Sequence, residues 1–164
     1  MNNEVIVLVG LPGTGKSTWL QKEGLNEKAC FIYSTDLYLE SVAAELGKTY
    51  SEVHGEYFNE AQKFMNEGLE AAIETGGTIV WDQTNLGVKK RKSILSKFDK
   101  SWKKTAVVFD IPPDIAERLA SRPGKVIPVA TLKSMASSYS EPTLDEGFDE
   151  IIRADNMSEL KNKE

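Results

Sequence analysis

One eight-residue segment constrains the fold more than any other part of this 164-residue chain. Residues 10–17 read Gly-Leu-Pro-Gly-Thr-Gly-Lys-Ser, a complete G-x-x-x-x-G-K-[ST] pattern. The apolar run at residues 5–9 predicts a buried strand before it, and residues 16–23 predict the start of a helix after it. In that setting the glycines let backbone N–H groups turn towards phosphate oxygens, Lys16 reaches the β- and γ-phosphates, and Ser17 offers its hydroxyl to Mg²⁺. The segment therefore predicts binding of a nucleoside triphosphate.

The rest of the chain alternates short apolar runs with longer segments of helical spacing. The runs that predict strands lie at residues 5–9, 30–33, 78–81 and 106–109, with a fifth at 150–152. The clearest helix is predicted over about residues 51–74, and Gly76-Gly77 ends it. This alternation predicts a single α/β domain over residues 1–164, with a polar tail from about residue 156. Its parallel sheet should carry helices on both sides and bind ligands at the carboxyl ends of its strands.

Charge is distributed unevenly along the chain. The net charge of −5 argues against a protein that coats nucleic acid without specificity. Between Lys89 and Lys104, however, eight basic residues stand against one acid. This basic segment is either the solvated face of a surface helix or a patch that steers a polyanionic substrate.

The cysteine content and the hydropathy of the chain indicate the cellular compartment in which it is expected to occur. The single cysteine, Cys30, lies in an apolar run and excludes a disulfide within the chain. No apolar stretch is long enough to cross a bilayer, and the N-terminus lacks the apolar core of a signal peptide. We therefore expect a cytoplasmic protein without membrane contact. The oligomeric state stays open, because amphipathic helices bury equally well within one chain or between copies.

Acidic residues follow two of the predicted strands. Asp82 ends the strand at residues 78–81, where a phosphate-loop protein holds Mg²⁺ directly or through water, so it is the Walker-B candidate. Asp36 follows the strand at residues 30–33, where it could cap the next helix or serve as the general base that a hydroxyl acceptor requires. Thr84 and Asn85 could orient the acid, touch substrate or shape the turn.

Arg118 and Arg122 lie four residues apart on a predicted helix that Pro123-Gly124 ends. A mobile arginine segment of this kind would close over the triphosphate and neutralise charge on the transferred group. The alternative is a pair of solvated surface arginines. His54 is the only histidine, and among helical residues it is expected to be structural.

Together and in this order, these segments resemble the kinase domain of the polynucleotide 5′-hydroxyl kinases of phage and animal end-healing enzymes. The last of them is similar to the P-T-L-x-E-G-F ending of the animal enzymes. The segments are residues 10–19, Thr35-Asp36, residues 82–85 with Arg91, Arg118 with Arg122, residues 127–129, Met135 and residues 141–148. The resemblance implies a P-loop NTPase fold of the adenylate-kinase-like kind. Such a fold is a three-layer α/β/α domain with a central parallel sheet and an arginine-bearing lid.

The resemblance also implies a reaction and a set of roles. The γ-phosphate of ATP would be transferred to the 5′-hydroxyl end of DNA or RNA, with Mg²⁺ as cofactor. Asp36 would be the catalytic base, and Lys16 and Arg122 would be the catalytic cations. Donor phosphates would be bound by Gly13, Thr14, Gly15, Lys16, Ser17, Thr18, Arg118 and Arg122, Mg²⁺ by Ser17 and Asp82, and the acceptor by Asp36, Thr84, Asn85 and Arg91.

Two departures from the family pattern leave alternatives open. Leu39 stands where the phage pattern has an arginine that contacts the acceptor, and Thr35 stands where the family often has one. A kinase for another hydroxyl, such as a hydroxymethylated base in DNA, a nucleoside or a small metabolite, is therefore the second hypothesis. A non-catalytic ATP-dependent switch or toxin-like module is the third, and it would need Lys16 and Asp82 but no acceptor base at Asp36.

Overall fold

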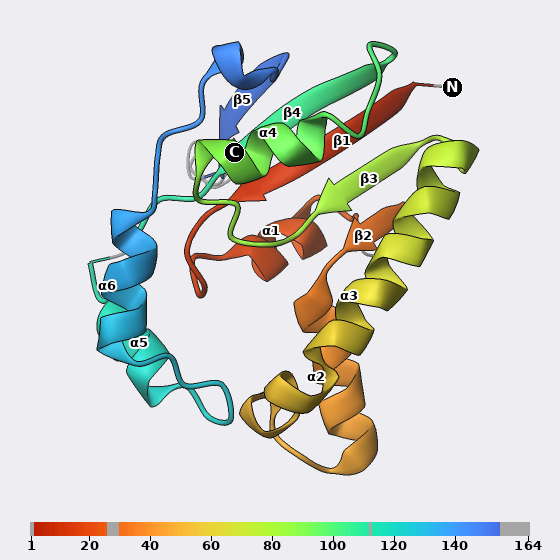
Figure 1. Cartoon of the computed structure of the whole chain (residues 1–164). Helices are drawn as coiled ribbons and strands as arrows, with labels where there is room; N and C mark the ends of the chain where they lie inside the picture. The colour runs from red at the N-terminus through yellow and green to blue at the C-terminus, as the bar shows by residue number, and fades with distance from the viewer. Residues whose placement is uncertain (1, 26–29, 112, 155–164) are drawn as a thin grey trace.

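A five-stranded parallel sheet forms the centre of the computed structural model, which describes residues 2–25, 30–111 and 113–154 (Figure 1). The strand order is β2-β3-β1-β4-β5, and every neighbouring pair is parallel. The strands are β1 (Asn3–Val9), β2 (Phe31–Tyr33), β3 (Thr78–Trp81), β4 (Trp102–Val108) and β5 (Glu150–Arg153). All five predicted strands are present. β4 begins four residues before its predicted start, because the polar residues Lys103 and Lys104 pair with the beginning of β1 and so belong to the strand without being part of an apolar run.

The side chains of β1 alternate between two apolar layers. Val5, Val7 and Val9 face α3 (Tyr50–Thr75) and α4 (Val88–Leu95). Ile6 and Leu8 face the other side, where α1 (Lys16–Lys22) contributes Leu20. Strands buried on both faces are typical of a parallel sheet between helices. The predicted three-layer α/β/α architecture is therefore confirmed.

Two capped helices extend from the β2 side of the sheet. Helix α2 (Thr35–Leu46) begins after Ser34, whose side chain accepts a hydrogen bond from Leu37 N at 3.2 Å. Ser34 and not Asp36 is therefore the N-cap, and Asp36 lies inside the first turn. Helix α3 begins with a capping box at Thr49 and ends at Gly76, which has a positive φ of 82°. The two helices pack through a small apolar cluster of Leu39, Ala43, Val53 and Ala61.

The remaining helices lie on the opposite side of the molecule from α2 (Figure 1). Helices α5 (Ile115–Ser121) and α6 (Val129–Ser137) share an apolar cluster with Leu11 of the segment after β1 and Leu86 of the segment after β3. The 3₁₀ turn η1 (Leu144–Glu146) then leads into β5. We call residues 115–137 the lid, because this segment packs against the glycine-rich loop through that cluster.

The basic segment at residues 89–104 does not form one helical face. Lys89, Lys90 and Lys92 lie exposed on α4, whereas Arg91 on the same helix is fully buried. The last two basic residues, Lys103 and Lys104, belong to β4. Of the two alternatives for this segment, the face of one surface helix does not fit the whole of it, because the helix ends at Leu95 and a strand begins at Trp102.

No helix of the described segments is both long and apolar enough to cross a membrane. The polar tail predicted from about residue 156 lies outside the described residues.

Candidate active site

Residues 10–15 connect β1 to α1 as a tight loop around an open space. Gly13 and Gly15 have positive φ angles of 76° and 99°, which other residues adopt with strain. A Cβ on Gly13 would lie 2.9 Å from the lid residue Leu119, whereas a Cβ on Gly15 would meet nothing within 4 Å. Lys16 Nζ donates a 2.9 Å hydrogen bond across the loop to the carbonyl of Gly10. The loop thus presents backbone and an ammonium group to the same space, as phosphate binding requires.

Two partly buried groups of opposite charge face this space. Burial lowers the pKa of Lys16 to about 8, although the carboxylates of Asp82 and Asp36 act in the opposite direction. Burial also raises the pKa of Asp82, and the nearby Lys16 opposes that shift. The charged form of each group therefore lacks enough opposite charge nearby to offset its desolvation. A bound phosphate would supply that charge to Lys16, and a divalent cation would supply it to Asp82.

The residues present fit Mg²⁺ bound together with a nucleotide. Within residues 2–25, 30–111 and 113–154 no group of three or more His, Cys, Asp or Glu side chains could hold a metal ion by itself. Mg²⁺ is usually held by one or two protein ligands together with substrate phosphates and water. Ser17 and Asp82 both line the space in front of Lys16 and could supply such ligands.

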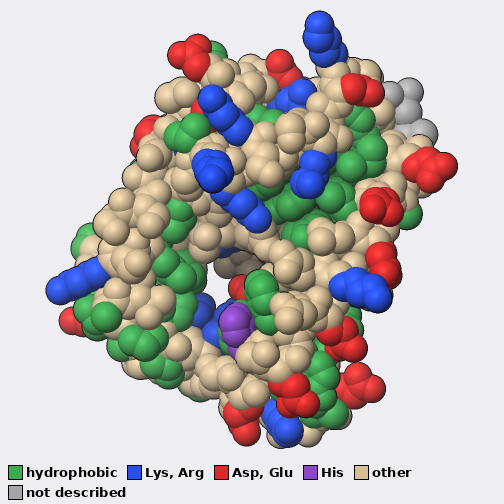
Figure 2. All heavy atoms as spheres, in the orientation of Figure 1, with side chains coloured by type: hydrophobic (Ala, Val, Ile, Leu, Met, Phe, Trp, Pro, Cys, Tyr) green, Lys and Arg blue, Asp and Glu red, His purple; other side chains and the backbone are tan. Residues whose placement is uncertain are grey.

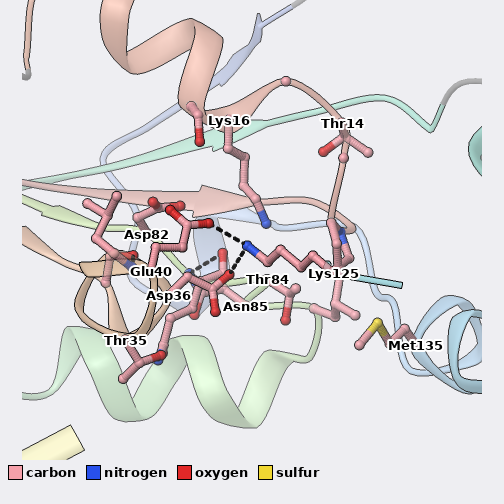
Figure 3. A pocket seen from close by; sticks show the side chains of 18 of the residues that line it. Thr14, Lys16, Thr35, Asp36, Glu40, Asp82, Thr84, Asn85, Lys125 and Met135 are labelled. Atoms are coloured by element: carbon pink, nitrogen blue, oxygen red, sulfur yellow. Dashed lines mark hydrogen bonds and ion pairs between the residues drawn. The ribbon is translucent and has the colours of Figure 1, made fainter. Parts of the chain in front are cut away.

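Asp36 lies on the first turn of α2, and each of its two carboxylate oxygens contacts a different side chain. The Tyr50 hydroxyl donates a 2.6 Å hydrogen bond to Asp36 Oδ1, and Lys125 Nζ lies 3.4 Å from Asp36 Oδ2. Lys125 Nζ also contacts Glu40 Oε1 at 2.8 Å and lies 4.4 Å from the centre of the Tyr50 ring. Figure 3 shows Lys16 and Lys125 pointing into the same space as Asp36 and Asp82. Sequence reasoning missed Lys125, although its place directly after Pro123-Gly124 at the end of the arginine segment was the available signal.

The two lid arginines differ in their surroundings. Arg118 is exposed and pairs with Asp114 one helical turn away at 2.9 Å. Arg122 follows the end of α5 with an extended backbone, so the two arginines do not share a helical face as predicted. Arg122 Nε donates to the Lys125 carbonyl at 3.0 Å, and its Nη2 is buried without a hydrogen-bond partner among the described residues. An anionic ligand would satisfy that nitrogen.

One cavity of about 880 Å³ joins these groups. It extends from the glycine-rich loop to α2, with the lid on one side and the beginning of α4 on another. Of the residues predicted for the site, those that line it are Gly13, Thr14, Gly15, Lys16, Ser17, Thr18, Asp36, Asp82, Thr84, Asn85, Arg118 and Arg122. Further lining residues that the sequence analysis did not assign to the site include Glu40, His54, Phe58, Lys90 and Lys125.

Arg91 is the predicted site residue that does not line the cavity. Its side chain is fully buried, and its Nη2 lies 2.7 Å from Glu146 Oε1 in η1. Its Nη1 donates to the carbonyls of Asn85 and Leu86 at 3.0 and 2.8 Å. The guanidinium is therefore enclosed by protein, and this geometry does not support the predicted contact with an acceptor. Arg91 instead fixes the loop that carries the predicted acceptor residues.

Asn85 links that loop to the sheet. Among the residues that the structure describes, it is the one residue other than glycine with a positive φ, 49°. Only 2% of its surface is exposed. Its Nδ2 donates to the carbonyl of Leu8 in β1 at 2.7 Å. The carbonyl of Thr84 accepts a 3.0 Å hydrogen bond from Gly10 N at the start of the glycine-rich loop. The segment after β3 is thus tied to the segment after β1, and the Thr84 side chain lies at the cavity wall.

A family model of the AAA domain, AAA_33, matches residues 5–142. The chain belongs to this family. Solved structures with the same fold include a presumed kinase from Chloroflexus aurantiacus, with 16% identity, a TM-score of 0.63 and coverage of 99% of this chain and 98% of that one. The P-loop kinase-like fold of this AAA domain implies nucleotide binding at the glycine-rich loop.

Two other solved structures are longer than this AAA domain. A chain of the Pnkp1/Rnl/Hen1 complex matches with 21% identity and a TM-score of 0.53, over 74% of this chain and 39% of that one. A fungal RNA kinase matches with 16% identity and a TM-score of 0.52, over 93% of this chain and 38% of that one. The AAA domain thus spans about two fifths of each of these chains, and at such identities the likeness shows the fold alone.

Proposed function

We propose that this AAA domain transfers the γ-phosphoryl group of ATP to the 5′-hydroxyl end of DNA or RNA. The observation that carries the proposal is that one cavity holds the phosphate-binding Lys16, the carboxylate of Asp36 and, at its edge, Lys90 of the basic helix α4. A nucleotide switch has no use for a second carboxylate held towards the space in front of the phosphate loop. A kinase needs it to accept the proton of the acceptor hydroxyl.

In the proposed reaction Asp36 accepts the proton of the 5′-hydroxyl. The hydroxyl oxygen forms a bond to the γ-phosphorus, and the bond from that phosphorus to the bridging oxygen of ADP breaks. Lys16 and Arg122 neutralise the charge on the phosphate oxygens, and the lid excludes water. When bound at Ser17 and Asp82, Mg²⁺ supplies further charge neutralisation on the phosphates.

The exposed lysines of α4 support a polyanionic acceptor. Lys89, Lys90 and Lys92 are exposed on this helix, and Lys90 also borders the cavity. Figure 2 shows Lys and Arg side chains gathered beside the hollow, on the side where α4 lies in Figure 1. Such a surface attracts a nucleic acid backbone and directs its end towards the cavity.

A phosphate-transfer assay tests the proposal. Wild type and Asp36→Ala are incubated with γ-labelled ATP and Mg²⁺. The acceptors are 5′-hydroxyl RNA, 5′-hydroxyl DNA, and a DNA whose only free hydroxyls lie on hydroxymethylated bases. We expect labelling of 5′ ends by wild type and none by the variant. Nucleotide binding without labelling of any 5′ end would contradict the proposal.

A second candidate is a kinase for a small hydroxyl acceptor, and the position of Leu39 favours it. Leu39 is fully buried between α2 and α3, and Thr35 is also buried, so neither position offers a cation to an acceptor phosphate. Solved structures of this fold include a sugar kinase from Janibacter, with 16% identity and a TM-score of 0.57. Transfer to a nucleoside or a sugar, but not to an oligonucleotide, would establish this alternative.

A further inference from the structure

Three aromatic rings follow one another along the first half of α3. Tyr50, His54 and Phe58 are spaced four residues apart, which places them on one face of the helix. The centroids of the Tyr50 and His54 rings are 5.6 Å apart, and those of His54 and Phe58 are 5.2 Å apart. The rings are tilted by 53° and 32°, so they form a continuous series of ring contacts.

This series begins at the candidate base. The Tyr50 hydroxyl is hydrogen-bonded to Asp36 Oδ1 at 2.6 Å, and the ring of Tyr50 is covered on one side by Lys125. His54 and Phe58 then continue along the wall of the same cavity. The ring surface that stays open to a ligand is therefore next to the point where the acceptor hydroxyl would meet Asp36.

The two outer rings differ in how they are held. Phe58 is half-buried and packs against the apolar cluster between α2 and α3 that contains Leu39 and Val53, so its position is fixed from behind. His54 is exposed, and Figure 2 shows the histidine at the mouth of the hollow. Leu37, with 43% of its surface exposed, lies on the same cavity wall. An exposed ring at the cavity mouth, next to an apolar side chain, offers a flat face to a ligand.

A nucleobase is the ligand that such a surface fits best. Every base has a π-face, and stacking on aromatic side chains is the usual way in which proteins hold single-stranded bases without reading their sequence. A sugar or polyol acceptor has no flat π-face, so it would gain little from stacking on these two rings. The neighbouring lysines of α4 suit the phosphates that follow such a base.

We propose that His54 and Phe58 form a stacking wall for the base of the terminal nucleotide whose 5′-hydroxyl meets Asp36. This inference rests on the proposed polynucleotide kinase function and names the part of the acceptor that the cavity recognises. The wall holds the base by its face and therefore accepts purines and pyrimidines alike.

The test uses two oligonucleotides that both carry a 5′-hydroxyl. One has an intact terminal nucleotide, and in the other that nucleotide lacks its base. For wild type we expect a KM that is about 5- to 150-fold lower for the intact oligonucleotide, the range that stacking of one base gives. His54→Ala should remove most of this difference and His54→Phe should retain it. Glu56→Ala, at an exposed position of the same helix, serves as the matched control and should behave as wild type.

The possible results separate the two proposals. If wild type labels both oligonucleotides with the same KM, the stacking wall is refuted while the kinase function stands. If His54→Ala weakens both acceptors equally, the ring is structural and the stacking wall is again refuted. If wild type labels neither oligonucleotide but binds nucleotide, the kinase function fails and the acceptor wall fails with it.

Discussion

The hydroxyl of Tyr50 donates a 2.6 Å hydrogen bond to Asp36 Oδ1 and so joins the first turns of α3 and α2 at the edge of the cavity. Burial and the Asp36 carboxylate together raise the pKa of Tyr50 well above its ordinary value. The hydroxyl therefore stays protonated at physiological pH and remains a donor to this oxygen. The other oxygen, Oδ2, lies 3.4 Å from Lys125 Nζ, and in the proposed reaction it would accept the proton of the acceptor hydroxyl.

Asp36→Asn should lower the rate of phosphoryl transfer about 10²- to 10⁴-fold, the usual contribution of a general base. The affinity for ATP should change little, because Asp36 is proposed to contact the acceptor and not the nucleotide. Single-turnover transfer and calorimetric nucleotide binding measure the two effects separately. Tyr50→Phe keeps the ring and removes only the donor, so its loss of rate should be smaller. A large loss of ATP affinity in Asp36→Asn would show that this residue is structural.

Lys16 should couple nucleotide binding to proton uptake. Its pKa of about 8 lies below its ordinary value of 10.5, so its contribution to folding stability falls as the pH drops from 10.5 through 8. Phosphates favour the charged amine, so nucleotide binding at pH 8.5 should be accompanied by the uptake of at most about 0.8 proton at this group.

Calorimetry in two buffers of different ionisation enthalpy measures this uptake. Lys16→Ala should lose the uptake together with most of the affinity and of the transfer activity. Binding by wild type at pH 8.5 without proton uptake would show that Lys16 is already fully charged before the nucleotide arrives.

Removing one partner of the Arg91–Glu146 ion pair should be strongly destabilising, because both side chains are almost completely buried and the other charge would be left unpaired. Arg91→Met leaves an unpaired buried carboxylate and should cost about 3–5 kcal/mol. In a domain of this size that corresponds to a fall in Tm of about 6–20 °C, measurable by thermal denaturation.

The exposed pair of Lys103 and Glu150 offers the comparison, since Lys103→Met should cost at most about 1 kcal/mol. The double variant Arg91→Met/Glu146→Leu should recover part of the loss. The carbonyls of Asn85 and Leu86 would still lack their donor. If Arg91→Met and Lys103→Met lower the free energy of unfolding by the same small amount, the buried pair is no more important to stability than the exposed one.

Neutralising Lys89, Lys90 and Lys92 together should raise the KM for long oligonucleotides more than for short ones. If all three contact phosphates, the slope of log affinity against log salt should decrease by about 2. Transfer at several salt concentrations measures this slope. A variant with Lys22, Lys48 and Lys63 replaced has the same net charge and changes exposed lysines elsewhere, so it should retain the wild-type slope. Identical slopes for the two triple variants would leave α4 as a solvated surface.

Local patterns allowed the sheet, the glycine-rich loop and the acids at the strand ends to be predicted. The glycine-rich loop follows β1 by covalent connection, and acids at strand ends meet at one edge of a parallel sheet, so Lys16, Asp36 and Asp82 could be placed from spacing alone. The role of Arg91 could not, because it depends on Glu146, 55 residues away in the sequence. Lys125 and the aromatic face of α3 were missed for a related reason. They reach the cavity only because the lid and α3 extend towards each other, which no local pattern encodes.

The Arg91–Glu146 pair also has an evolutionary consequence. Neither residue can be exchanged alone without leaving a charge enclosed in the protein, and Arg91 supports the loop on which Thr84 and Asn85 are held. Positions 91 and 146 should therefore behave as one heritable unit. Among related chains that keep this loop, we expect replacements at the two positions to occur together, as covariation between α4 and the segment before β5.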